Sequence, residues 1–286
     1  MCTPLSPIRF LFEDIKQVLC INTEEFSDAV KEITSNYATK PQIKIVCDPN
    51  VGLQDLAACW EIGTTQIRIN ECLLCALWAS SYFIANAYIS LCDYLNKQSQ
   101  ILPIFDDSIE LLNYAKSLCP SYAEWSCELP VPLDFENDQY ANLANLIVPI
   151  AADVIICHET AHMFLKHQKD GGFQQEVDAD NLAINWIIGT KKEPYPIKEL
   201  SVMCAFITNI FLTLTPKKQG NCHPSAFDRL KNYLENLSID DNDILWVIAI
   251  LSYRAWEKEF EKDELIIPEN TEMTYKASFY SLLYHE

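Results

Sequence analysis

The chain has 286 residues, of which 40 are Asp or Glu and 21 are Lys or Arg, giving a formal net charge of −19. This excess of acidic residues disfavours binding to nucleic-acid phosphates or to anionic lipid, so we expect neither as a partner. Hydrophobic residues make up 49% of the chain, which is enough for a folded core and too many for a disordered protein. Only 6 residues are glycine, which disfavours a turn-rich all-β fold and favours long helices.

The N-terminal part of the sequence predicts one helix and two strands. Apolar residues at a spacing of three and four predict the helix over residues 8–37. The segments 43–47 and 64–70 alternate apolar and polar residues, which predicts two strands, and we expect them to pair in a small sheet. If strand 64–70 lies at an edge of that sheet, it could bind an extended peptide through backbone hydrogen bonds.

The stretch from Cys72 to Cys92 has no charged residue and is long enough to cross a bilayer. It contains Ser, Asn and Tyr side chains and has an acid at each end, so we interpret it as a buried core helix, with a membrane span as the alternative. Residues 1–15 lack the pattern of a secretory signal, so we expect the 12 cysteines to be free thiols in a cytoplasmic protein. Cys72 and Cys75 lie among apolar residues, which indicates core packing and not a metal or redox site.

The rest of the chain is mainly helical. Helices are predicted at residues 106–118, 139–168, 174–188, 197–214, 225–237 and 242–262. Pro149 either kinks the helix that contains it or starts a new one, and Gly189 ends the next helix. The sum is an α+β fold that is mostly helical. We expect one domain over residues 1–286, with the sheet at 41–70, the chemically important helices at 139–190 and a helical C-terminal part at 197–286.

The residues from His158 to His162, with the sequence HETAH, carry the strongest chemical signal. Two histidines four residues apart share one face of a helix and can bind a single metal ion. Glu159 projects beside them, where its carboxylate can take a proton from a water molecule held by the metal. Apolar residues flank the motif, so we expect a buried helix. Two buried histidines then need a metal ion or hydrogen-bonding partners.

A third ligand is expected after the glycine pair at Gly171 and Gly172, in the sequence EVDAD. Glu176 and Asp180 lie one turn apart on one face of a helix that the glycine turn can fold back beside the first. Glu176 can then complete a His-His-Glu set, and Asp180 can accept the free N–H of a metal-bound histidine. An acidic first turn that stabilises the helix dipole is the alternative. His167 points off the ligand face and is the lesser candidate for the third ligand.

HETAH followed by EVDAD resembles the pattern of the gluzincin metallopeptidases. EVDADNLA is similar to the E-x-E-A-D-x-x-A sequence of the HtpX-type peptidases. The strand segments QIKIVCD and GTTQIRINECLL before HETAH, and HPSAFDRL after it, are similar to that group as well. Length, acidity and the central position of HETAH also resemble the phage-exclusion (Lit-type) peptidases, which are soluble proteins that cut a translation factor.

These resemblances imply a zincin-like core and agree with the roles that the residues themselves suggest. A Zn²⁺ ion would be held by His158, His162 and Glu176, with one coordination position left open for catalysis. Glu159 would act as the general base. We therefore expect a cytoplasmic zinc endopeptidase that hydrolyses a specific intracellular protein.

The oxyanion that develops during hydrolysis needs a hydrogen-bond donor, and His223 and Arg229 in HPSAFDRL are the candidates. A loop residue and a surface ion pair are the respective alternatives for these two side chains. Two other functions remain open: a catalytically silent zinc-binding scaffold that regulates a partner, and an integral membrane peptidase that uses residues 72–92. An intact Glu159 favours the enzyme over the scaffold, because a scaffold has no need of that carboxylate.

Overall fold

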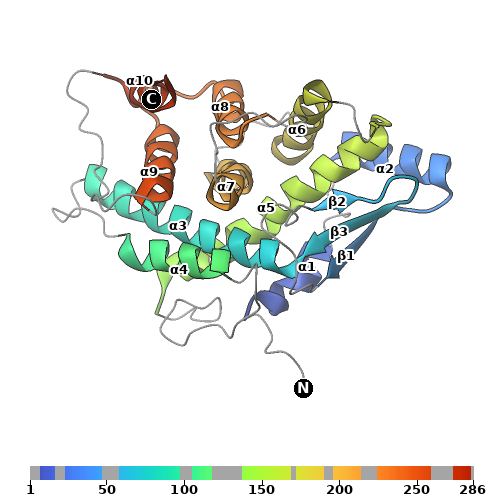
Figure 1. Cartoon of the computed structure of the whole chain (residues 1–286), viewed down its shortest axis with the longest axis horizontal. Coiled ribbons are helices and arrows are strands. Elements are labelled where there is room, and N and C mark those ends of the chain that lie inside the picture. The colour runs from blue at the N-terminus through green and yellow to red at the C-terminus, as the bar shows by residue number, and fades with distance from the viewer. Residues whose placement is uncertain are drawn as a thin grey trace.

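The computed structural model describes residues 7–16, 23–46, 58–96, 105–117, 137–168, 172–189, 196–213, 224–258 and 273–284. Helices dominate these residues, and the only sheet among them has three short strands (Figure 1). The fold is therefore α+β and mostly helical, as the sequence predicts.

The first helical segment is interrupted, so the prediction of one helix over residues 8–37 is wrong. The chain instead forms a 3-10 turn η1 (Pro7–Leu11), a short helix α1 (Phe12–Lys16) and a separate helix α2 (Glu24–Tyr37). Thr23 has an extended backbone, and its side chain accepts a hydrogen bond from the N–H of Phe26. A threonine that caps a helix in this way starts a new helix, even where the apolar spacing suggests that an earlier one continues.

The sheet has the order β1-β3-β2, with β1 at Gln42–Val46, β3 at Gln66–Asn70 and β2 at Cys59–Trp60. β1 and β3 are the two strands that the sequence predicts, and they pair in parallel. β2, which the sequence does not predict, pairs antiparallel to β3. β3 therefore lies in the centre of the sheet. The condition for peptide binding by residues 64–70, an edge position, is therefore not met, because β2 lies at that edge.

A tight turn accounts for β2. The N–H of Thr64 donates to the carbonyl of Glu61 over 2.9 Å. Gly63 has a φ of 83°, which residues other than glycine rarely adopt. The turn reverses the chain directly before β3, so that the two residues Cys59 and Trp60 fold back against it.

β3 leads directly into α3 (Glu71–Leu95), where the side chain of Asn70 caps the helix by accepting the N–H of Cys72 over 2.9 Å. Cys72 and Cys75 are buried free thiols, as predicted. Among the described residues, α3 and the helix Gln139–Phe164 are apolar and long enough to cross a membrane. Buried residues make up 89% of the most apolar window of α3 and 50% of that of the other helix. Core helices of folded proteins have the same character, so length and composition here are weak grounds for a membrane span.

The remaining helices agree closely with the predicted segments, except for the last one. They are α4 (Asp106–Ser117), α5 (Gln139–Phe164), α6 (Phe173–Ile188), α7 (Pro196–Leu212), α8 (Ala226–Asn236), α9 (Ile244–Lys258) and α10 (Tyr275–Tyr284). α5 continues through Pro149 as one helix. The sequence does not predict α10, whose Phe279 is fully buried and stacks near Trp246 of α9.

α5 lies in the middle of the fold and packs against α3, α6 and α7 (Figure 1). Its buried positions include several alanines, among them Ala144, Ala151 and Ala161, which let neighbouring helices approach closely. The C-terminal half of α5 contacts both the sheet edge at β2 and the helix α6. The site described below lies in this half of α5.

Candidate active site

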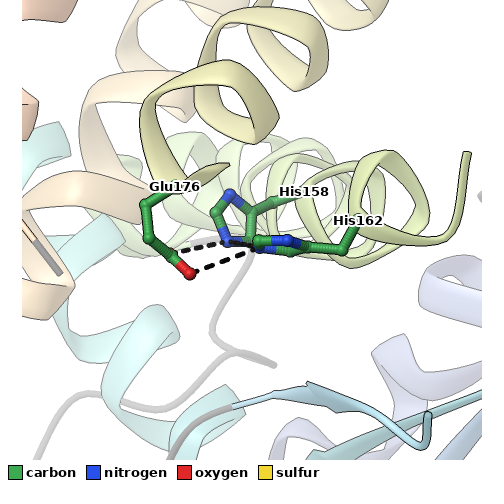
Figure 2. Close-up of side chains that lie close together, drawn as sticks. All are labelled: His158, His162 and Glu176. Atoms are coloured by element: carbon green, nitrogen blue, oxygen red, sulfur yellow. Dashed lines mark hydrogen bonds and ion pairs between the residues drawn. The ribbon is translucent and has the colours of Figure 1, made fainter. Parts of the chain in front are cut away.

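Three side chains predicted to bind a metal ion meet between α5 and α6 (Figure 2). Nε2 of His162 lies 3.0 Å from Nε2 of His158, one turn away on α5. Glu176, in the first turn of α6, places Oε2 3.4 Å from Nε2 of His158 and Oε1 3.5 Å from Nε2 of His162. Among the described residues, no other group of three His, Cys, Asp or Glu side chains brings its donor atoms within 4.8 Å of one another.

The spacing and chemistry of these donors fit a zinc ion. Tetrahedral ligands that lie about 2.0–2.2 Å from zinc are about 3.3–3.6 Å apart. The contacts of Glu176 with the two histidines, at 3.4 and 3.5 Å, fall in this range, and the two imidazoles are slightly closer. Two imidazoles and one carboxylate form a ligand set found in catalytic zinc sites, where the fourth position is open.

The start of α6 brings Glu176 to the histidines. Gly172 precedes the helix with a φ of 76°, which glycine adopts without strain. Ala179 and Ala183 are buried, and their small side chains allow the close approach of α6 to α5 that the sequence predicts. Gly171 lies outside the described residues.

Asp180 occupies the position predicted for it. Its Oδ1 lies 2.9 Å from Nδ1 of His158, whose other ring nitrogen, Nε2, faces Glu176. Arg229, near the start of α8, binds the same carboxylate through two atoms, with Nε 2.7 Å from Oδ2 and Nη2 2.5 Å from Oδ1. A bidentate pair of this kind fixes the orientation of the carboxylate.

Of the two predicted oxyanion donors, the structure describes only Arg229. His223 lies outside the described residues. The Arg229 side chain is 17% exposed, and it lies over the ring of Phe206 with its Cζ 5.5 Å from the ring centre. Its ion pair is with Asp180, so the contacts in the structure assign it to holding that carboxylate. A direct contact with substrate stays a prediction.

The surrounding charges hold the two histidines in different protonation states. Burial by itself lowers the pKa of His158, but the carboxylates of Asp180 and Glu176 outweigh it and raise that pKa to about 9. Burial and the neighbouring His158 lower the pKa of His162 to about 4. Burial would raise the pKa of Asp180, but Arg229 and His158 lower it to about 2. In the metal-free form the imidazole pair therefore carries one positive charge at neutral pH, on His158.

Glu159 is held by a residue that sequence reasoning missed. The backbone N–H of Trp60 in β2 donates to Oε2 of Glu159 over 2.7 Å. The next residue, Glu61, donates its N–H to Gln66 of β3, so the N–H of Trp60 faces away from the sheet. Burial raises the pKa of Glu159, while His158 and this N–H oppose the rise. Gly63, which forms the turn between β2 and β3, is the residue in the sequence that could have indicated a strand before β3.

His167 is a further neighbour of the site. Its Nδ1 lies 2.8 Å from Nδ1 of His162, the ring nitrogen that does not face Glu176. Helical spacing puts His167 off the face of His158 and His162, and its side chain is not part of the three-residue group. The spacing alone did not show that His167 contacts His162 through Nδ1, the ring nitrogen that faces away from Glu176.

With this geometry established, comparisons with known proteins identify the class of the chain. Residues 67–249, which include all three residues of the candidate metal-binding group, match the family model described as Peptidase U49. This chain belongs to the peptidase U49 family. It is therefore a peptidase, a hydrolase that acts on peptide bonds, as predicted, and the match supports the resemblance to Lit-type peptidases. Searches of curated proteins and of solved structures found no match.

Proposed function

We propose that this peptidase is a zinc-dependent endopeptidase that cuts a specific intracellular protein in the cytoplasm. One observation carries the proposal: the donor atoms of His158, His162 and Glu176 converge at 3.0–3.5 Å from one another, close to the separations of ligands around a tetrahedral zinc ion. The family match supports peptide-bond hydrolysis, and the metal is inferred from this geometry.

Glu159, Trp60 and Asp180 surround the proposed ligands, and each has a separate role in the proposed reaction. A bound zinc ion lowers the pKa of a water molecule and polarises the scissile carbonyl. Glu159 would accept a proton from the attacking water and deliver it to the leaving amine. The N–H of Trp60 fixes the Glu159 carboxylate, and burial, which raises its pKa, makes it a better base than a surface glutamate. Asp180 accepts the Nδ1–H of His158, which leaves Nε2 free to bind the metal.

The free edge of β2 supports a polypeptide substrate and a zincin-like core. Within the described residues β2 pairs only with β3, and the backbone groups of Trp60 face away from that partner. The carbonyl of Trp60 on this edge could accept a hydrogen bond from an extended peptide, while its N–H already donates to Glu159. A peptide bound there would pass beside Glu159, because the N–H of Trp60 already contacts that carboxylate.

The substitution Glu159→Gln tests the proposal. We expect the full-length variant to retain zinc by elemental analysis and to lose peptide hydrolysis by at least about 100-fold, because the general base is removed. Glu61→Gln, at an exposed position directly after β2, is the matched control and should keep activity. The substrate can be found by comparing newly formed protein N-termini in cell extracts treated with the wild type and with Glu159→Gln.

Two outcomes would reject parts of this proposal. Full activity of Glu159→Gln would remove the assigned base, and absence of zinc from the wild type would remove the metal. A zinc-loaded wild type that produces no new N-termini in any extract would favour the silent scaffold. Cell fractionation separates the cytoplasmic location from the alternative that residues 72–92 cross a membrane.

A further inference from the structure

The end of α5 brings His167 back against His162. Leu165 caps the helix, and Lys166 follows with a left-handed φ of 57°. The N–H of Lys166 donates to Met163 over 3.2 Å, and the N–H of His167 donates to the carbonyl of His162 over 3.0 Å. These two bonds form a Schellman motif, which places the residue two beyond the cap against the residue three before it. In this chain both residues are histidines.

The two rings meet through one nitrogen each. Nδ1 of His167 lies 2.8 Å from Nδ1 of His162, and the ring centres are 4.9 Å apart with the planes inclined at 69°. Such a contact requires one nitrogen to donate and the other to accept. Nε2 of His162 faces Nε2 of His158 and Oε1 of Glu176, where a metal ligand needs a free lone pair. The proton of neutral His162 then belongs on Nδ1.

We propose that His167 is a positioning residue for the metal centre, which accepts the Nδ1–H of His162 and thereby fixes the tautomer and the orientation of that ring. This inference rests on the proposed zinc site. It gives each proposed metal-binding histidine a neighbour at Nδ1, since Oδ1 of Asp180 lies 2.9 Å from Nδ1 of His158. The acceptor for His162 is a neutral imidazole, so it orients the ring without adding a negative charge.

The same contact separates His167 from the ligands themselves. Its Nδ1 is engaged at the back of the His162 ring, on the opposite side from the atoms that face Glu176. It is also absent from the group of donor atoms that lie within 4.8 Å of one another among the described residues. His167 therefore acts on the metal only through His162.

Three variants of the full chain test this role by metal binding. His167→Leu removes the acceptor while keeping a side chain of similar size. His167→Asn restores an acceptor, because its Oδ1 is attached to Cγ as Nδ1 is in histidine. Gln168→Leu is the matched control at an exposed neighbouring position. Zinc dissociation constants are measured by competition with a chromophoric chelator, and the visible spectrum is recorded after loading with Co²⁺.

We expect His167→Leu to weaken zinc binding by about 10–100-fold and to shift the Co²⁺ bands. His167→Asn should recover most of the affinity and the wild-type spectrum, while Gln168→Leu should match the wild type. Equal affinity and spectra for His167→Leu and wild type overturn the inference, as does an Asn variant that binds as weakly as the Leu variant. A wild type that binds neither metal overturns the zinc site itself, and this inference with it.

Discussion

Oδ1 of Asp180 lies 2.9 Å from Nδ1 of His158, and Arg229 donates to both oxygens of the same carboxylate. The three side chains form a chain of contacts that runs from α5 through α6 to α8. An imidazole held in this way keeps one tautomer and one orientation, which favours metal binding through its other nitrogen.

The first prediction concerns Asp180. We expect Asp180→Asn to weaken zinc binding by about 10–100-fold, because the amide is a poorer acceptor for the N–H of His158 than the carboxylate. Chelator competition measures the affinity. Asp178→Asn, an exposed acid in the same helix whose contact is with Gln174, is the control and should bind zinc as the wild type does. Equal losses in the two variants would indicate a general effect of charge.

The second prediction concerns the stability that Arg229 provides. The side chains of Arg229 and Asp180 are 17% and 11% exposed, so Arg229→Met removes the cation that binds both oxygens of a largely buried carboxylate and leaves it only the contact with His158. The expected loss is about 3–5 kcal/mol in the free energy of unfolding, measured by urea denaturation of the metal-free protein. Arg254→Met breaks an exposed pair with Glu257 and should cost less than about 1 kcal/mol.

The same variant addresses the alternative role of Arg229. If Arg229→Met kept its stability and zinc affinity but lost kcat, direct contact with the reacting carbonyl would explain the result better than support of Asp180. A loss of both stability and zinc affinity favours the support role that the contacts indicate.

The third prediction concerns protons released on metal binding. The pKa of His158 is raised to about 9, so at pH 7 this imidazole is protonated, and it must lose its proton to bind zinc. The pKa of His162 is lowered to about 4, so it releases none. We expect about one proton per zinc between pH 5 and pH 8, and an apparent affinity that rises about tenfold per pH unit until about pH 9. Calorimetry at pH 7 in buffers of different ionisation enthalpy measures the proton count. Identical heats in all buffers would contradict the prediction.

The fourth prediction concerns the N–H of Trp60. Trp60→Pro removes this donor at an edge position where proline is tolerated, whereas Trp60→Ala removes the same side chain and keeps the donor. A hydrogen bond to a charged group contributes about 1.5–3 kcal/mol, so we expect kcat/KM of the Pro variant to be about 10–100-fold below that of the Ala variant. Because the N–H lowers the pKa of Glu159, the acid limb of the pH profile should move to higher pH in the Pro variant. Equal profiles would show that this contact does not tune the base.

Much of the site could be predicted because its residues are close in sequence and lie on helices of regular period. The spacing of His158 and His162 fixes a shared helix face, and Glu176 and Asp180 follow the same rule after the glycine turn. The structure brings all four side chains together. Their chemical roles depend on a metal and a substrate, and these belong to the proposals above.

The missed features depend on where elements end and on contacts between distant segments. β2 has only two residues, too few to show an alternating pattern, and the centre or edge position of β3 depended on it. The start of α2 as a separate helix is marked by one residue, the helix cap Thr23. The contact of His167 with His162 required the last turn of α5, and helix ends are poorly marked by apolar spacing.

The ligands differ in how firmly the fold holds them. His158 and His162 belong to α5, the helix enclosed by α3, α6 and α7, whereas Glu176 stands one turn from the start of α6 at Gly172. Amide hydrogen exchange should therefore be slow around the two histidines and faster in the first turn of α6. Fraying of that turn would withdraw one ligand while two remained in place, which provides a route for metal exchange without unfolding of the domain.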